Sequence, residues 1–172
     1  IGPGLVGGAL LGQLAGQMER LSGGARLDLR VRGIGRSKSM LLSDAPIAPD
    51  AWKDIPAERW QPLDLETFAR HVQTEHLPHA VIIDCSASAD VASHYRDWLA
   101  AGIHVVTPNK KANSGPYEYY ASLGATRRAS GSHYLYEATV GAGLPVIQTL
   151  RDLRETGDQG RSIEGKIGRA HV

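Results

Sequence analysis

Three glycines near the start of the chain have the spacing of a phosphate-binding turn. Gly2, Gly4 and Gly7 form the pattern G-x-G-x-x-G. In such a turn the first glycine makes a tight bend, the second lets the backbone approach a pyrophosphate, and the third lets a helix pack closely. Apolar residues at helical spacing predict a helix from Leu5 to about Ser22, whose amino end would attract an anion. The pattern alone fits a purely structural glycine turn equally well, and no strand precedes it.

A basic segment at positions 35–38 favours a phosphate monoester as ligand. Gly35-Arg36-Ser37-Lys38 follows a predicted strand, at a point where an NAD site usually carries an acidic residue for the ribose hydroxyls. Two cations and a hydroxyl would instead hold a 2′-phosphate, which favours NADPH over NADH. The alternative is a solvated loop of charges, since basic residues are common on surfaces.

Two further polar segments follow predicted strands. Cys85-Ser86-Ala87-Ser88 offers hydroxyls where a cofactor would cross, although a serine there also suits a helix cap. Thr107-Pro108-Asn109-Lys110-Lys111 would place Lys110 near the nicotinamide or the substrate, with Lys111 turned elsewhere. The alternative is an exposed pair of lysines without a function, although charged residues directly after a buried strand often take part in binding or catalysis.

The densest motif is Glu-Ala-Thr-Val-Gly-Ala-Gly-Leu-Pro at residues 137–145. Its two glycines free the backbone for unusual dihedral angles, and a carboxylate with several carbonyls is an oxygen cage for a hard cation. The residues alone indicate only a second anion-binding or ligand-binding loop. The seven histidines show no metal-ligand spacing.

Apolar, β-rich runs alternate with helical patterns. Strands are predicted at 27–34, 80–85, 103–107 and 134–137, and the proline-rich residues 40–62 are predicted as a surface loop. Helices are predicted from 5 to 22, from a cap at Asp64 to about His76, from Ser88 or Asp90 to Gly102, around 117–125, and from Pro145 to Glu155. The expected inward-facing side chains are Leu65, Phe68, Val72, Val91, Tyr95, Trp98 and Leu99.

This alternation predicts an α/β protein with a Rossmann-type doubly wound parallel sheet and right-handed crossovers. Ligands of such a sheet bind at the carboxyl ends of the strands, and the segments 2–7, 35–38, 85–88, 107–111 and 137–143 all lie there. Their agreement favours the nucleotide-binding interpretation of the glycine turn. The sheet is expected to be truncated at its first strand, because only Ile1 precedes the turn.

Composition argues against several classes of partner. A net charge of +1 does not favour nucleic-acid binding, and no apolar run approaches the roughly 20 residues of a membrane span. Cys85 is the only cysteine, so the chain has no internal disulfide, which fits a reducing cytoplasm. The 172 residues, 42% of them hydrophobic, are enough for one domain with a full core.

The chain resembles the nucleotide-binding half of homoserine dehydrogenase in three stretches: Gly-Pro-Gly-Leu-Val-Gly, Thr-Pro-Asn-Lys-Lys-Ala and Glu-Ala-Thr-Val-Gly-Ala-Gly-Leu-Pro-Val-Ile. The resemblance runs from residue 1 to about Gly165 and is nearest to the branch fused to aspartokinase. It implies NAD(P)-dependent interconversion of L-homoserine and L-aspartate 4-semialdehyde, on the route to threonine and methionine. It also implies a homo-oligomer.

The same resemblance implies roles for individual residues. The cofactor would be held by the glycine turn, the basic segment and the two later loops, through Gly2, Gly4, Leu5, Val6, Gly7, Arg36, Ser37, Lys38, Ser86 and Lys110. A sodium ion would be held by one carboxylate and three backbone carbonyls, those of Glu137, Val140, Ala142 and Leu144.

Two departures from the family limit what this chain is expected to do. The family's catalytic lysine and aspartate lie in a later α/β domain. Residues 1–165 are therefore expected to form an NAD(P)-binding domain that is truncated at both ends. This domain is expected to fold poorly and to have no catalytic activity. Residues 166–172 replace the family's Phe-Ser-Gly-Thr continuation and are expected to be a non-native tail.

Two other functions fit the same pattern. An aspartate-semialdehyde-type oxidoreductase would use a catalytic cysteine, and Cys85 follows an aspartate at a strand end. Loss of activity on alkylation of Cys85 would favour that mechanism. A non-catalytic NADPH sensor is the other alternative, because a fold fixes no chemistry. A lysine and an aspartate downstream would favour the dehydrogenase.

Overall fold

The strands of the computed structural model, which describes residues 1–74, 76–162 and 164, form two small sheets. One is antiparallel and has the order β1 (Gly33–Gly35), β2 (Ser39–Leu42), β3 (Gln61–Pro62). The other is parallel and has the order β4 (Val81–Ile83), β5 (His104–Val106), β6 (Tyr134–Leu135). The predicted α/β class with a parallel sheet is confirmed, and the expected tail at 166–172 lies outside the described residues.

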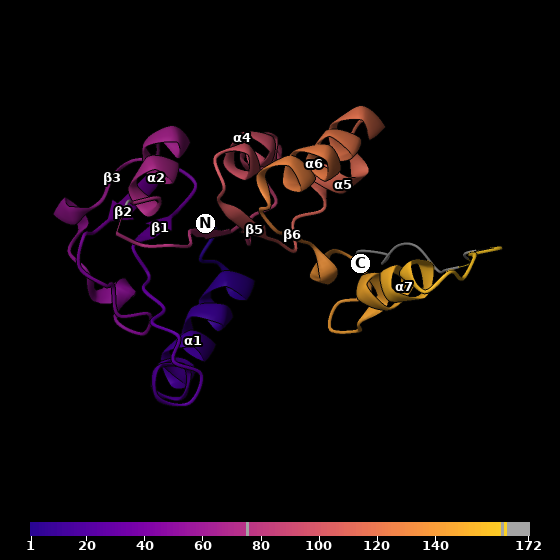
Figure 1. Ribbon diagram of the computed structural model, residues 1–172. Helices are drawn as coiled ribbons and strands as arrows, with labels where there is room; N and C mark the ends of the chain where they lie inside the picture. The colour runs from indigo at the N-terminus through magenta and orange to yellow at the C-terminus, as the bar shows by residue number, and fades with distance from the viewer. Residues whose placement is uncertain (75, 163, 165–172) are drawn as a thin grey trace, which may run out of the picture.

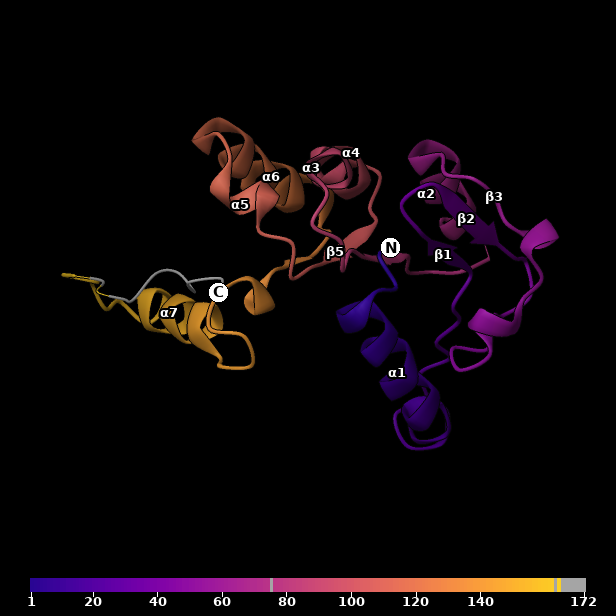
Figure 2. The same cartoon turned by 180° about the vertical axis from the view of Figure 1, so that it is seen from behind.

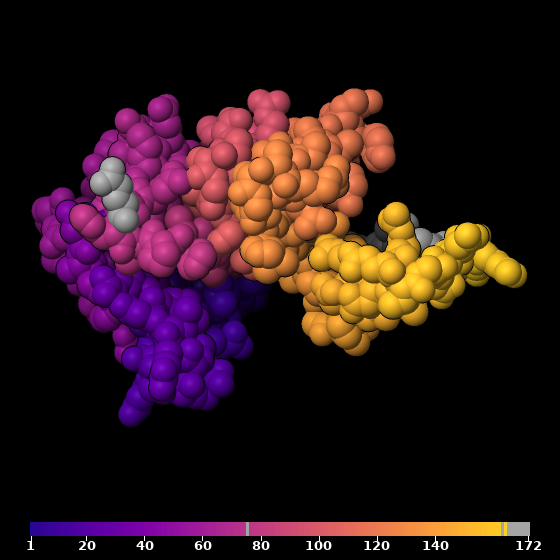
Figure 3. Space-filling model, viewed as in Figure 1, coloured from indigo at the N-terminus to yellow at the C-terminus, as the bar shows by residue number. Residues whose placement is uncertain are grey.

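Helices cover both sides of the strands (Figure 1). α1 (Leu5–Gly23) lies on one side. The opposite side carries α2 (Leu65–Val72), α3 (Ala89–Ser93), α4 (Tyr95–Ala100), α5 (Lys111–Ser114) and α6 (Tyr117–Ser130), as the reverse view also shows (Figure 2). α7 (Val146–Glu155) forms a lobe at one end of the molecule (Figure 3). None of the described helices is both long and apolar enough to cross a membrane.

The first two residues connect the two sheets. The amide of Gly2 donates to the carbonyl of Gly35 at the end of β1, at 2.8 Å. On the other side, the amino group of Ile1 donates to Ile83 at 2.7 Å, and Cys85 donates to the carbonyl of Ile1 at 2.8 Å. These bonds are those of a parallel ladder, so Ile1 runs beside the end of β4 in the same direction.

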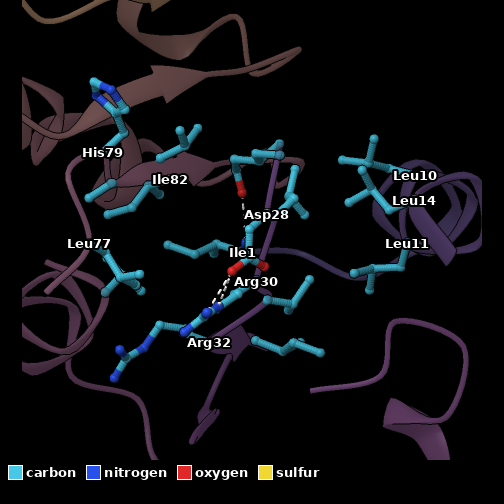
Figure 4. Close-up of a pocket in the computed structure, with 18 of the residues that line it drawn as sticks. Ile1, Leu10, Leu11, Leu14, Asp28, Arg30, Arg32, Leu77, His79 and Ile82 are labelled. Carbon is cyan, nitrogen blue, oxygen red and sulfur yellow. Dashed lines mark hydrogen bonds and ion pairs between the residues drawn. The ribbon is translucent and has the colours of Figure 1, made fainter. Parts of the chain in front are cut away.

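An apolar groove of about 670 Å³ continues the line of Ile1 between β4 and the segment 26–34 (Figure 4). Helix α1 closes one wall of the groove, and β4 closes the other. Ala80 and Asp84 bond to β5, whereas Ile83 and Cys85 bond to Ile1, so alternate amide groups of β4 face the groove. Its apolar lining includes Leu10, Leu11, Leu14, Leu27, Leu29, Val31 and Ile82.

The strand predicted at 27–34 is wrong over most of its length, since only 33 and 34 join β1. Its alternation of apolar side chains is real, because Leu27, Leu29 and Val31 all line the groove. Alternation identifies the side chains of one face, but a strand also needs a neighbour, and none of the described strands pairs with residues 27–32. Val31 accepts instead from Ile47 in a loop.

The surface loop predicted at 40–62 is wrong at both ends. Ser39–Leu42 and Gln61–Pro62 form β2 and β3, with Met40 and Leu41 buried. Proline suits the last position of a short edge strand, where it need not donate to the ladder. Between these strands the chain does form turns, including the short 3-10 helices Trp52–Asp54 and Ala57–Arg59.

The other predicted elements are confirmed in place, with shifted ends. Asp64 caps α2 by accepting from the amides of Glu66 and Thr67, although the helix ends at Val72, four residues before the predicted end. Ser88 caps α3, and a break at His94 separates it from α4. α6 continues to Ser130 and stops before Gly131, whose φ of 74° suits a glycine.

The remaining differences concern shorter or unpredicted elements. β6 ends at Leu135, two residues before the predicted end. Helix α5 was not predicted from the sequence.

The predicted inward-facing residues form the main core. Six of them are buried and Val72 is partly buried against them: Leu65, Phe68, Val91, Tyr95, Trp98 and Leu99. In α1, Leu5 is exposed, whereas Leu11 packs against a second core cluster. That cluster contains Ile34, Leu41, Ile47 and Trp52, beneath the antiparallel sheet.

The groove predicts that an apolar extension joined to Ile1 will stabilise the chain. An extension of five residues rich in valine would place a new strand beside β4 and the segment 26–34. It would also replace the amino group of Ile1, whose pKa is lowered by burial, with an uncharged amide. We expect the unfolding temperature to rise by about 5 °C or more, since about 1 kcal/mol moves it by about 2–4 °C in a domain of this size.

A glycine-serine extension of equal length is the matched control, because it supplies the same amide without apolar side chains. Calorimetry measures both. An equal rise with both extensions, or no rise with the valine-rich one, would contradict the assignment of the groove as a strand position.

Candidate cofactor-binding site

The glycine turn has the geometry that its spacing predicts. Gly2 has a φ of 75°, a left-handed conformation that disfavours other residues. A β-carbon on Gly2 would lie 2.7 Å from the amide nitrogen of Ser86, and one on Gly7 would lie 2.3 Å from the carbonyl oxygen of Gly2. The turn and the close packing predicted for these two glycines are therefore confirmed.

The amino end of α1 is open in front of this turn. Gly4 occupies the N-cap position without a side-chain hydrogen bond, and a β-carbon there would meet nothing within 4 Å. Leu5 and Val6 are 93% and 57% exposed, so two apolar side chains border the open backbone amides of the first turn. A helix that begins in this way can receive a phosphate group at its amino end.

A buried carboxylate network lies beside the turn, at the carboxyl ends of β4 and β5. Asp84 is fully buried and accepts from the amide of Ser86 at 2.8 Å, from the hydroxyl of Tyr95 and from the side-chain amide of Asn109 at 2.9 Å. The hydroxyl of Thr107 donates to the carbonyl of Asp84 at 2.7 Å. The network thus fixes the loop that carries Ser86 to the loop that carries Asn109.

Burial and the neighbouring carboxylate raise the pKa of Tyr95 far above its usual value. The phenol therefore stays a neutral donor to Asp84 throughout the physiological pH range. Sequence reasoning missed Asp84, Tyr95 and Asn109 as site residues. The sequence did contain a signal, since Asp84 is an acidic residue inside the otherwise apolar run 80–85. A carboxylate buried in a strand needs several hydrogen-bond donors, which predicts a polar network around it.

Asn109 positions the segment that contains both lysines. Besides its bond to Asp84, its side chain donates to the carbonyl of Ser88 at 2.9 Å and accepts from the amide of Lys111 at 3.1 Å. Lys110 is the N-cap residue of α5, and both lysines are exposed. Exposure therefore does not distinguish Lys110 from Lys111, and the expected difference in their roles stays a prediction.

The basic segment lies next to the glycine turn, because Gly35 accepts from Gly2. Arg36, Ser37 and Lys38 are all exposed and form the turn between β1 and β2. The guanidinium carbon of Arg36 lies 3.8 Å from the ring centre of Trp60 and 5.3 Å from that of Trp52. Sequence reasoning did not connect these tryptophans with the basic segment.

Glu137 lies in a 3-10 turn after β6 and caps helix α7. Its two carboxylate oxygens accept from the amides of Ile147 and Gln148, each at 2.8 Å. Gly141 and Ala142 both have positive φ, 71° and 52°. An alanine in this conformation is uncommon and persists where the surroundings hold it, often near ligands.

The oxygen atoms of residues 137–144 are of the kinds that bind a hard cation. They comprise one carboxylate, with lone pairs left after capping, and a loop of backbone carbonyls. The carbonyl of Leu144 also accepts from Val146 at 2.9 Å. Among the described residues, no three histidine, cysteine, aspartate or glutamate side chains form a metal cluster, so any cation here would depend on backbone oxygens.

The thiol of Cys85 is half-buried rather than fully buried. Burial raises its pKa above the usual value for a thiol, although the amino group of Ile1 partly opposes that shift. A raised pKa lowers the fraction of thiolate, the form that attacks a carbonyl. The half-buried position of Cys85 and the raised pKa of its thiol therefore do not favour the cysteine mechanism.

Comparison with known proteins identifies relatives of this chain. Residues 2–137 match the family described as "Homoserine dehydrogenase, NAD binding domain". The chain is 54% identical over 166 residues to a chloroplastic bifunctional aspartokinase/homoserine dehydrogenase 2 of Zea mays, covering 96% of this chain and 18% of that protein. It is 34% identical over 167 residues to a homoserine dehydrogenase of Schizosaccharomyces pombe, covering 96% of this chain and 44% of that protein.

A solved structure shares the fold. A hyperthermophilic archaeal homoserine dehydrogenase mutant in complex with NADPH superimposes with a TM-score of 0.66 at 25% identity, covering 88% of this chain and 46% of that one. The chain thus spans less than half the length of each of these relatives.

Proposed function

Because the chain belongs to the homoserine dehydrogenase NAD-binding domain family, we propose that residues 1–165 form the cofactor-binding part of a homoserine dehydrogenase. The whole protein would interconvert L-homoserine and L-aspartate 4-semialdehyde by hydride transfer with NAD(P), as a step towards threonine and methionine. The observation that carries this proposal is the glycine turn, with Gly2 at positive φ against Ser86 and the amino end of α1 open.

The residues of the turn would bind the cofactor through its pyrophosphate. The first amides of α1 would donate to the phosphate oxygens, and Leu5 and Val6 would cover the apolar parts of the ligand. Ser86, held by Asp84, would lie beside it. The nicotinamide, when bound, supplies the atom that accepts or donates the hydride. None of residues 1–165 is assigned a catalytic role, so catalytic groups would come from elsewhere in the protein.

The location and the assembly of the protein are parts of the same proposal. A single cysteine fits a reducing compartment, and we propose the cytoplasm, whereas the Zea mays relative is named as chloroplastic. Cell fractionation tests this assignment. We also propose a homo-oligomer, which gel filtration of the full-length protein would test.

NADPH is the proposed cofactor in preference to NADH. Arg36 and Lys38 are exposed cations beside the glycine turn, where an acidic residue would favour the free ribose hydroxyls of NADH. The archaeal relative was solved in complex with NADPH, which supports NADPH as a ligand of this fold. Ser37 would add a hydroxyl donor to the 2′-phosphate.

A sodium ion is proposed at Glu137 and the carbonyls of Val140, Ala142 and Leu144. Support comes from the oxygen donors in this loop and from Ala142, whose left-handed conformation turns the backbone sharply. Since Glu137 also caps α7, the ion would link the loop after β6 to that helix.

The cofactor preference predicts that Arg36→Ala in the full-length protein weakens the binding of NADPH far more than the binding of NADH. Losing a hydrogen bond to a charged group costs about 1.5–3 kcal/mol, or about one to two decades of affinity. The measurement is the KM for both cofactors in wild type and mutant, with Arg59→Ala as a control at another exposed arginine. Unchanged selectivity in Arg36→Ala would reject the role of the basic segment.

The position of Lys110 predicts a second difference. Lys110→Ala should reduce cofactor binding or kcat by about tenfold or more, because an ammonium facing the nicotinamide or the substrate makes charge-assisted contacts. Lys111→Ala is the matched control and should change either quantity less than twofold. Equal, small effects of both substitutions would show that the pair is only a solvated surface.

The sodium proposal predicts that sodium chloride raises the unfolding temperature of the full-length protein above its value in tetramethylammonium chloride of equal ionic strength. Binding to the folded state alone stabilises it by mass action. Glu137→Gln should remove most of this difference, because it replaces the carboxylate with a neutral amide. A difference that persists in the mutant, or that is absent in wild type, would contradict a sodium site at Glu137.

A further inference from the structure

Arg36 is exposed, but its guanidinium lies over the rings of two tryptophans. Its guanidinium carbon lies 3.8 Å from the ring centre of Trp60 and 5.3 Å from that of Trp52. The two indoles contact each other edge to face, with ring centres 6.4 Å apart and planes at 62°. At 3.8 Å the arginine is well within the distance at which an aromatic face attracts a cation.

The tryptophans themselves are anchored. Trp52 is 6% exposed and packs with Ile34, Leu41 and Ile47 in the core cluster beneath the antiparallel sheet, and Trp60 packs against the same cluster. The backbone of Arg36 is also fixed, since its amide donates to the carbonyl of Ser39 at 2.7 Å. The indole pair is therefore a rigid support for a side chain that would otherwise have many rotamers.

The charge of Arg36 remains available to a ligand. In the described part of the chain, Arg30, Arg32 and Arg96 form ion pairs with aspartates, whereas Arg36 forms none. Stacking engages the face of a guanidinium and leaves the N–H groups around its edge free to donate in its plane. Those donors suit the oxygens of a phosphate, which a guanidinium can bind with two parallel hydrogen bonds.

We propose that Trp60, supported by Trp52, is a positioning residue that holds Arg36 in the orientation needed to bind the 2′-phosphate of adenosine. The proposal rests on the NADPH preference proposed above and extends it. Selectivity would arise from a preorganised guanidinium and not from the positive charge of the segment alone. Lys38, for which no aromatic contact is found among the described residues, would add charge without the same directional effect.

Binding of two nucleotides to the full-length protein tests the proposal. Adenosine 2′,5′-bisphosphate carries the 2′-phosphate and 5′-AMP lacks it, so their affinities separate the arginine contact from the rest of the site. We expect Trp60→Ala to weaken binding of the bisphosphate about two- to fivefold, the scale of a cation–π contact at an exposed site, and to leave binding of 5′-AMP unchanged. Trp60→Phe should recover most of the loss, because it keeps an aromatic face.

Arg36→Ala and the double variant show whether Trp60 acts through Arg36. If it does, adding Trp60→Ala to Arg36→Ala causes no further loss of bisphosphate affinity. Lys53→Ala is the control, since Lys53 also lies over Trp52, at 5.8 Å, and should leave both affinities unchanged. Thermal unfolding identifies any variant that fails to fold. If Trp60→Ala does, Trp60→Leu carries the test, because it keeps an apolar side chain for packing but removes the aromatic face.

Each outcome decides between the proposals. Equal weakening of both nucleotides by Trp60→Ala, or additive losses in the double variant, would overturn the positioning role. A loss of selectivity in Arg36→Ala that Trp60→Ala does not reproduce would overturn it while leaving the NADPH preference intact. Unchanged selectivity in Arg36→Ala would reject the preference itself.

Discussion

The buried carboxylate of Asp84 is the constraint on which the geometry of the site depends. A carboxylate removed from water is stable only if donors surround it, and here the donors come from the loop after β4, from helix α4 and from the loop after β5, through Ser86, Tyr95 and Asn109. Satisfying one charge therefore fixes three segments of the chain. Removing any one donor would leave the charge partly unpaired, so the network holds these loops in one arrangement.

The glycine turn is built onto this arrangement. Gly2 lies so close to Cys85 and Ser86 that no side chain fits at its position, and its amide also reaches Gly35 at the end of β1. The segment fixed by Asp84 and the end of the antiparallel sheet thus both position the turn. The consequence is that the open amino end of α1, the basic segment and Ser86 lie around a common point, although they are far apart in the sequence.

The sequence predicted the features that depend on local chemistry. The tight turn at Gly2, the cap at Asp64 and the buried face of Tyr95, Trp98 and Leu99 all follow from spacing and residue type. It did not predict features that depend on a partner elsewhere in the chain. The strand predicted at 27–34 lacks a neighbouring strand over most of its length, and β2 forms inside the segment predicted as a proline-rich loop. Trp60 is distant from Arg36 in the sequence and lies beside it only in the folded chain.

The candidate site combines a buried part, the turn at Gly2 and the network of Asp84, with exposed charged residues. The turn at Gly2 packs against the segment that the network of Asp84 holds, and the first amides of α1 would accept the pyrophosphate common to both nicotinamide cofactors. Arg36 would discriminate between the cofactors and Lys110 would lie near the nicotinamide or the substrate; both are exposed, Arg36 in the turn after β1 and Lys110 at the N-cap of α5. On the proposed function, affinity for a dinucleotide and selectivity for one of them would therefore depend on different residues. Substitutions in the exposed turns would then change selectivity at little cost in stability, provided that the proposed support beneath a charged side chain, such as Trp60 beneath Arg36, is preserved.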